Sequence, residues 1–135
     1  MSLITEDFLQ DNETEEKPND APAIPSTPPT IETSKINRID VIKLALSQVG
    51  YKEKRTNENL DDFTANAGIN NYTKYARDLD AIANFYNGEK QGFAWCDIFV
   101  DWCFITVYGV LEGLNLLCQK QGGSGAGCTY SMQYF

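Results

Sequence analysis

The sequence from Ala94 to Phe104 reads Ala-Trp-Cys-Asp-Ile-Phe-Val-Asp-Trp-Cys-Phe, and it decides how the rest of the chain is interpreted. Apolar residues recur here at the 3.6-residue spacing of a helix that lies against a core. These residues are Cys96, Phe99, Val100, Cys103, Phe104 and Val107. Asp97 and Asp101 fall on the other side of the same helix. The pattern therefore predicts an amphipathic helix whose apolar face begins with a cysteine.

Cys96 lies in the opening turn of this predicted helix, and the four residues ahead of it contain no Ser, Thr, Asp or Asn cap. Unpaired N–H groups and the positive end of the helix dipole favour a thiolate at such a position. Cys96 is thus a candidate nucleophile, with its backbone region as a candidate oxyanion donor. The alternative is that Cys96 and Cys103 are two small apolar residues packed on one helix face, as free cysteines usually are.

The acidic residues are concentrated at the start of the chain. The 135 residues carry a formal net charge of -8, and the segment before Asn37 holds eight of the 19 acidic residues, only two of the 11 basic ones and all five prolines. Such a composition does not bury enough apolar surface to offset chain entropy. Residues 1–36 are therefore predicted to be a disordered leader or linker, and residues 37–135 to be one domain.

Several classes of partner are excluded by composition. The predicted domain has nine basic and eleven acidic residues, so it has no positive excess for nucleic acid. No apolar run approaches the ~20 residues of a membrane span. The N-terminal residues lack the basic and apolar regions of a secretory signal, so synthesis in the cytoplasm is expected, with any export or release by another route.

Metal and cofactor binding are not expected. The four cysteines show no Cys-x-x-Cys spacing, and the sequence contains no histidine. A Cys118–Cys128 disulfide across the glycine-rich segment fits the spacing but is not favoured without a secretory context. The pairing of Cys103, Cys118 and Cys128 therefore stays open at this point.

Local signals predict further helices. One begins at an Asn37 cap and ends at Gly50, with a core face of Ile39, Ile42, Leu46 and Val49 flanked by Val41 and Ala45. Another begins after Asn70 or Asn71 and carries Tyr72, Tyr75, Ala76, Leu79 and Ala83.

The Cys96 helix is predicted to run to about Tyr108 and to end at Gly109, and a short helix with Leu111, Leu114 and Leu117 is closed by Gly122. Residues 51–69 are predicted to be a loop with one helical turn at 60–65, and residues 128–135 to open another helix. The run from Gly122 to Gly127 matches neither a phosphate loop nor Gly-x-Ser-x-Gly, so a flexible connector is predicted.

The Ala94–Phe104 stretch resembles the nucleophile helix of CHAP domains, the cysteine- and histidine-dependent amidohydrolases/peptidases of bacterial and phage cell-wall lysins. The resemblance covers roughly residues 36–135. Its further matching segments are Val41–Gly50, Tyr51–Lys54, Asn71–Tyr75 and Gly127–Ser131. It implies a papain-like α+β fold similar to that of NlpC-type peptidases, in which a helical lobe carries the cysteine and an antiparallel sheet carries a histidine.

By this resemblance Cys96 is the nucleophile, and Trp95 and Asp97 are motif neighbours without an assigned catalytic role. The family's histidine has no counterpart in this sequence. The resemblance therefore implies a truncated, mostly α part of the domain that lacks most of the sheet. Because such a sheet would cover the apolar helix faces, we expect marginal stability or self-association.

The function implied by the resemblance is that of a peptidoglycan hydrolase module, as in a phage endolysin. It would be an N-acetylmuramoyl-L-alanine amidase or an endopeptidase with a cysteine nucleophile, nearly inactive without a histidine. The alternative is a non-catalytic module that binds cell wall, a phage or mobile-element partner, or a second chain that completes the site. Tyr72, Tyr75 and Phe93 are candidates for lining a groove for a peptide or sugar, unless these rings fill the core.

Overall fold

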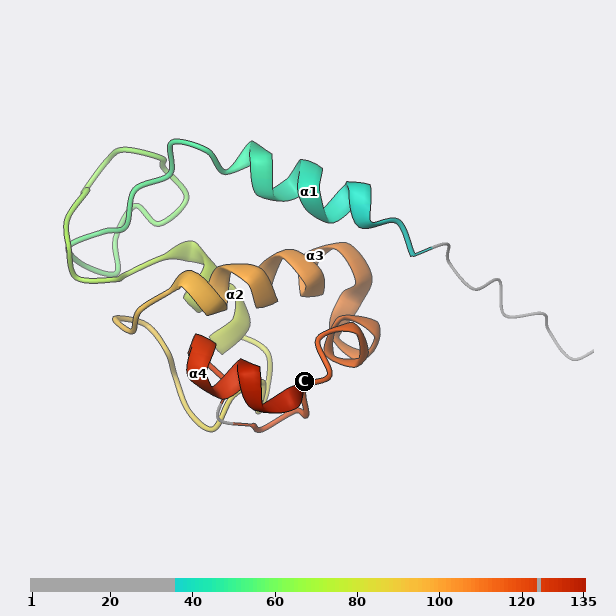
Figure 1. Cartoon of the computed structure of the whole chain (residues 1–135). Helices are drawn as coiled ribbons and strands as arrows, with labels where there is room; N and C mark the ends of the chain where they lie inside the picture. Colours follow the sequence, from blue (N-terminus) through green and yellow to red (C-terminus); the bar gives the residue numbers. More distant parts are fainter. Residues whose placement is uncertain (1–35, 124) are drawn as a thin grey trace, which may run out of the picture. The chain divides into compact units, whose positions relative to one another are not determined.

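The computed structural model describes residues 36–123 and 125–135 (Figure 1). The predicted disordered leader, apart from its last residue, lies outside the described residues. The helices are α1 (Arg38–Ser47), α2 (Lys74–Asp80), α3 (Cys96–Leu116), α4 (Cys128–Ser131) and the 3-10 helix η1 (Met132–Tyr134). Within the described ranges the extended segments form isolated bridges only. The described part of the chain is thus mostly helical, and none of its helices is long and apolar enough to cross a membrane.

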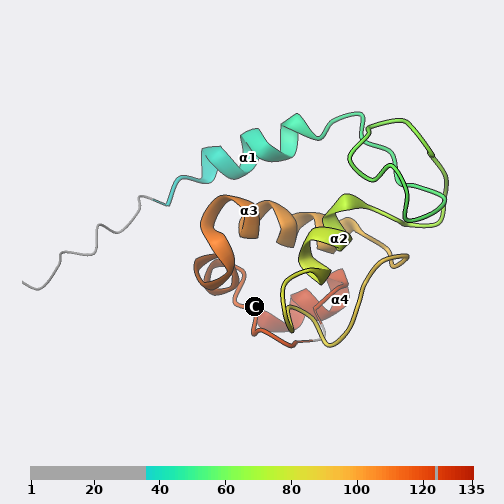
Figure 2. The ribbon, with the colours of Figure 1, turned by 180° about the vertical axis from the view of Figure 1, so that it is seen from behind.

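Helix α3 is the central element. Both α1 and α2 pack against it. Helix α4, near the C-terminal end of the chain, also contacts it. Figures 1 and 2 show α1 running alongside α3 in both views. Helix α3 therefore lies among segments that come from well-separated parts of the sequence.

The buried face of α3 differs from the predicted one. Asp97 and Asp101, expected on the outer side, are buried, whereas Cys96 and Val100 are exposed. The inner face is completed by Ile98, Trp102, Cys103 and Ile105. The burial of Cys103 is confirmed, but the prediction was wrong for Asp97 and Asp101, because both carboxylates accept hydrogen bonds inside the domain and these bonds offset part of the cost of burying them.

The Asn37 cap of α1 is confirmed, since its side chain accepts a 3.1 Å hydrogen bond from the backbone N–H of Ile39. The predicted core face is wrong. Its four main members, Ile39, Ile42, Leu46 and Val49, are all exposed, and the helix packs through Val41, Leu44 and Ala45 instead. Two neighbouring faces of α1 are apolar. The face that packs against the core is the one that carries fewer of the residues predicted to be buried.

The loop between α1 and α2 is ordered by backbone bridges from Lys54 to Ala67 and Tyr72. The helical turn predicted at 60–65 is absent from this described segment. In its place the Asp62 carboxylate accepts hydrogen bonds from the N–H groups of Thr64 at 2.8 Å and Ala65 at 2.7 Å. A side-chain acceptor of this kind stabilises a turn in competition with helix.

Helix α2 begins later than predicted because Thr73 caps it, accepting from the N–H of Ala76 at 3.1 Å. Tyr75, Ala76 and Leu79 are buried as predicted, but the helix ends at Asp80, so Ala83 lies beyond it and is exposed. Tyr75 is the centre of an aromatic cluster, with ring centroids at 4.8–5.7 Å from those of Tyr51, Trp95, Phe99 and Trp102.

Two glycine predictions have different outcomes. Gly109 interrupts α3 as predicted, with φ 78° and ψ 171°, so that the helix has two parts. The glycine-rich segment is not simply a connector. Gly123 pairs with Tyr86 in a parallel bridge, the N–H of Gly122 donates to Phe85, and Gly125 is buried. This segment leads the chain back to α4, which forms in the region predicted to open a further helix.

Candidate functional site

Cys96 is the first residue of α3, and its side chain is exposed. Trp95 occupies the N-cap position, and no side-chain hydrogen bond caps the helix there. The N–H groups of the first turn thus lack the usual side-chain acceptor, as the sequence predicts. The geometry presents a thiol and backbone donors together at the positive end of a long helix.

The position of Trp95 is fixed by a contact with a distant segment. Its indole Nε1 donates a 2.8 Å hydrogen bond to the Glu53 carboxylate, which belongs to the loop after α1. The ring also packs edge-on against Phe99, with centroids 6.2 Å apart. These contacts fix Trp95, the residue before Cys96. Such a positioning role fits a motif neighbour that takes no direct part in chemistry.

Asp97 faces α4. Its carboxylate accepts a 2.7 Å hydrogen bond from the hydroxyl of Ser131, and only 7% of the residue is exposed. This bond ties the first turn of α3 to the last described helices. Asp97 thus holds the site together and does not project toward the solvent beside Cys96.

Cys128 is the candidate site residue that the sequence analysis did not place beside Cys96. It is the first residue of α4, and its sulfur lies 3.4 Å from the sulfur of Cys96. The pKa of Cys128 is raised, first by its hydrogen bond with Cys96. The sequence contained one indication of a role for Cys128, its place in the matching segment Gly127–Ser131. The contact with Cys96 was not predictable from it, because the path of the glycine-rich segment brings the two cysteines together.

The other two cysteines are separate from this pair. Cys103 is buried, and burial raises the pKa of its thiol to about 11. Cys118 is exposed and follows the second part of α3 in a left-handed conformation, with φ 54°. The considered Cys118–Cys128 pairing is therefore not the one that the structure brings within reach.

A shallow hollow of about 210 Å³ adjoins Cys96 and is lined by Asn71, Ala94 and Trp95 as well. It is smaller than the usual range for a drug-sized ligand, so it fits one or two groups of an extended substrate better than an enclosed small molecule. Cys96 is therefore accessible at an open surface rather than at the bottom of a cleft.

The predicted groove residues do not line a single hollow. Tyr75 is a core residue with 1% exposure, and it borders a separate hollow of about 170 Å³ together with Tyr51, Trp95 and Phe99. Phe93 is exposed and lines a hollow of about 190 Å³ with Lys90, Ala126 and Tyr130. Tyr72 is half-buried and joins the bridge to Lys54 through its backbone. Of these three rings, Phe93 is the exposed one.

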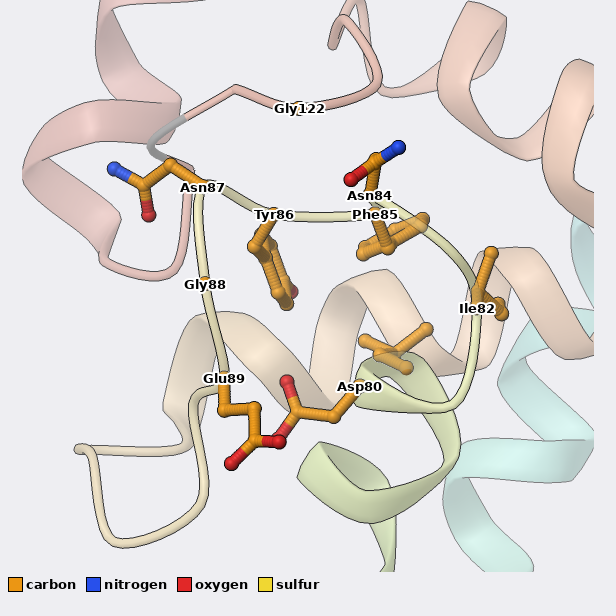
Figure 3. A pocket seen from close by; sticks show the side chains of 10 residues that line it. Asp80, Ile82, Asn84, Phe85, Tyr86, Asn87, Gly88, Glu89 and Gly122 are labelled. Carbon is orange, nitrogen blue, oxygen red and sulfur yellow. The ribbon is translucent and has the colours of Figure 1, made fainter.

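A larger pocket of about 430 Å³ lies on the loop after α2 (Figure 3). Its lining includes Asp80 and Glu89, whose side chains lie at one end, and the backbone of Gly122. Asp80 already accepts hydrogen bonds from the N–H groups of Lys90 and Gln91. Neither cysteine of the pair lines this pocket, so we place the candidate chemistry at Cys96 and not there.

No cluster of potential metal ligands occurs among the residues that the structure describes. Comparisons with known proteins returned no match, either to a family model, to a curated protein or to a solved structure.

Proposed function

We propose that this domain is the nucleophile-bearing lobe of a cysteine amidase or peptidase that resembles CHAP domains and acts on peptidoglycan peptides. The observation that carries the proposal is the position of Cys96, exposed as the first residue of α3 beside an open hollow. The order of the matching sequence segments supports the same reaction class. The bond cleaved would be the N-acetylmuramoyl-L-alanine amide or a peptide bond of the wall.

The chemistry follows from the helix start. A Cys96 thiolate would attack the carbonyl carbon of the scissile amide, and first-turn N–H groups would bind the developing oxyanion. The C–N bond then breaks, and the amine leaves with a proton. Water would hydrolyse the resulting thioester and regenerate the thiol.

The proton transfers need a group that these 135 residues do not supply. The sequence has no histidine. Two carboxylates bonded to the neighbours of Cys96 or next to it in sequence are occupied, since Glu53 accepts from Trp95 and Asp97 accepts from Ser131. Under this proposal an imidazole must come from outside these 135 residues, in the same polypeptide or a second one. We therefore expect residues 1–135 alone to hydrolyse cell walls very slowly.

A non-catalytic interaction module is the second candidate. It is favoured by the exposed apolar stripe of α1, at Ile39, Ile42, Leu46 and Val49. Contiguous apolar surface of this kind marks sites of association in many proteins. In that case Cys96 would have the reactivity of an ordinary surface thiol.

Thiol alkylation separates the two candidates, because Cys118 provides an exposed thiol that is not at a helix start. The rate for Cys96 is measured in the Cys118→Ser/Cys128→Ser variant, and the rate for Cys118 in the Cys96→Ser/Cys128→Ser variant. For a nucleophile we expect Cys96 to react at least about tenfold faster than Cys118 near pH 6.5. Equal rates, with both rising near pH ~8.5, would support the interaction module.

A second assay tests the reaction itself. Gram-positive cell walls are incubated with the purified chain, with and without added imidazole, and released amino groups are counted. Any activity should disappear in Cys96→Ser, since a serine hydroxyl is a much weaker nucleophile without a base. Wall cleavage that survives this substitution would show that the nucleophile assignment is wrong.

A further inference from the structure

The two exposed sulfurs at the helix starts form a contact that the proposed hydrolysis does not use. Cys96 and Cys128 are 32 positions apart in sequence, yet their sulfurs are 3.4 Å apart. Each is the first residue of its helix, and both side chains are exposed. Reagents in solution can therefore reach both thiols.

A second contact holds the two helix starts together. The hydroxyl of Ser131, one helical turn after Cys128, donates a 2.7 Å hydrogen bond to Asp97, the neighbour of Cys96. Because only 7% of Asp97 is exposed, this bond is largely shielded from competing water. The sulfur contact is thus supported by an adjacent contact between the same two helices.

We propose that Cys96 and Cys128 are a redox modification site, at which an intramolecular disulfide forms reversibly by exchange with a small disulfide such as oxidised glutathione. The sulfurs, now 3.4 Å apart, need to approach by about 1.4 Å to reach bonding distance. Helix α4 has four residues, so a small movement of this short segment suffices.

The exchange has two balanced steps. The Cys96 thiol loses its proton to solvent and attacks one sulfur of oxidised glutathione, whose S–S bond breaks, and one glutathione leaves as a thiolate that takes up a proton. Cys128 then loses its proton to solvent and attacks the Cys96 sulfur of the mixed disulfide, and the second glutathione leaves as a thiolate that takes up a proton. The two cysteines are oxidised and one glutathione disulfide is reduced to two thiols.

The order of these steps follows from the contact. The hydrogen bond with Cys96 raises the pKa of Cys128, so Cys128 keeps its proton while Cys96 is free. Once Cys96 carries glutathione, its thiol no longer makes the hydrogen bond that raises the pKa of Cys128. The second thiol is therefore released for attack only after the first has reacted.

The pairing itself does not depend on the proposed function. Cys103 is buried, and Cys118 lies after the second part of α3, so neither is placed to compete. If Cys96 is also the nucleophile, the disulfide would block acyl transfer until a reductant restores the thiol.

Peptide mapping tests the linkage. The full chain is incubated with oxidised glutathione, quenched with acid, alkylated and digested with trypsin and an enzyme that cleaves before aspartate. The sequence then places Cys96 in residues 91–96, Cys128 in 121–135, and both other cysteines in 101–120. We expect a species that joins 91–96 to 121–135 and disappears on reduction. A bond from 121–135 to 101–120, or glutathione on both Cys96 and Cys128 without a bond between them, would overturn the proposal.

Two variants sharpen the result. Cys118→Ser should leave the yield of the 91–96 to 121–135 species unchanged, whereas Cys128→Ser should stop oxidation at glutathionylated Cys96. Loss of the linkage in Cys118→Ser would overturn the assignment. Because mapping requires no hydrolase activity, failure of the proposed function would leave this test unaffected, and an active chain that forms no linkage would refute only the redox site.

Discussion

The hydroxyl of Tyr86 donates a 2.7 Å hydrogen bond to the carboxylate of Asp101 in the interior of the domain. Gln119 donates to the other carboxylate oxygen at 2.8 Å, and Asp101 has no exposed surface. Burial raises the pKa of Asp101 to about 7, although both hydrogen bonds favour the charged form. The central helix thus contains a carboxyl group that changes its charge near neutral pH.

We expect this carboxyl to make the domain less stable as the pH rises. Its pKa in the unfolded chain is near 3.8, so between pH 3.8 and about 7 the folded state binds the extra proton. Stability is then highest at the acidic end of this window and falls as the pH rises through it. Asp80, whose pKa is also raised by burial, acts in the same direction.

Urea unfolding between about pH 4.5 and 7.5 measures this effect, above the range where Asp61 and Asp62, whose pKa values are lowered, lose their charge. Asp101→Asn is the matched control, since its amide can keep a hydrogen bond with Tyr86. We expect the variant to gain about 3 kcal/mol relative to the parent over this window. An unchanged pH dependence in Asp101→Asn would contradict the assignment.

The two faces of α1 should respond differently to truncation. Leu44 packs against the core and Leu46 is 64% exposed. Leu44→Ala is expected to cost about 2 kcal/mol, and Leu46→Ala to change stability by less than about 0.5 kcal/mol. Urea midpoints compare the two variants. If Leu46→Ala were the more destabilising of the two variants, the face predicted from the sequence would be the one that packs against the core.

The exposed stripe of α1 should promote association between copies of the chain. Ile42→Lys and Leu46→Lys place charges in this stripe without touching the core. We expect both variants to lower the average mass measured by sedimentation velocity at high protein concentration. A parent chain that remains monomeric at all concentrations would show that the stripe does not drive self-association.

Two glycines in α3 should differ in their tolerance of alanine. Gly109 has φ +78° and open space around an added Cβ, so Gly109→Ala should cost about 1 kcal/mol from backbone strain alone. At Gly113 the added Cβ would lie 2.6 Å from the side chain and 3.2 Å from the Cα of Ile105. Gly113→Ala should therefore cost about 2 kcal/mol or more. Thermal unfolding of the two variants and the parent checks this order. A Gly109→Ala variant that is more stable than the parent would exclude backbone strain at Gly109.

The Glu53–Trp95 contact should matter for the site. Glu53→Gln retains an acceptor for the indole N–H, whereas Glu53→Leu removes it. We expect Glu53→Leu to lose about 1–2 kcal/mol and to alter the alkylation rate of Cys96, with Glu53→Gln close to the parent. If both variants alkylate like the parent, Trp95 does not position the helix start.

The features that local chemistry determines were predictable from the sequence. The cap at Asn37 and the break at Gly109 depend on residues within one turn, and both were predicted. The buried face of α3 was not. Asp101 is satisfied by Tyr86 and Gln119, which lie 15 and 18 positions away, and no periodicity reports such partners.

The candidate site was also predictable only where it depends on residues close in sequence. Cys96 at a helix start follows from its neighbours in sequence, but its contact with Cys128 depends on the return path of the chain. That path is set by the pairing of Gly123 with Tyr86, and glycine composition alone indicated flexibility. Tyr75, a candidate groove residue, is 1% exposed in the core, because an aromatic residue at helical spacing fits a core as well as a binding surface.

The break at Gly109 divides α3 into two hydrogen-bonded segments. Because helical hydrogen bonds do not run continuously through it, we expect two sets of amides with different protection in native-state hydrogen exchange. Opening of the second segment would loosen the chain that leads to α4 while the first turn, with Cys96, stays folded. The two sulfurs could then separate through a partial unfolding that requires less free energy than global unfolding.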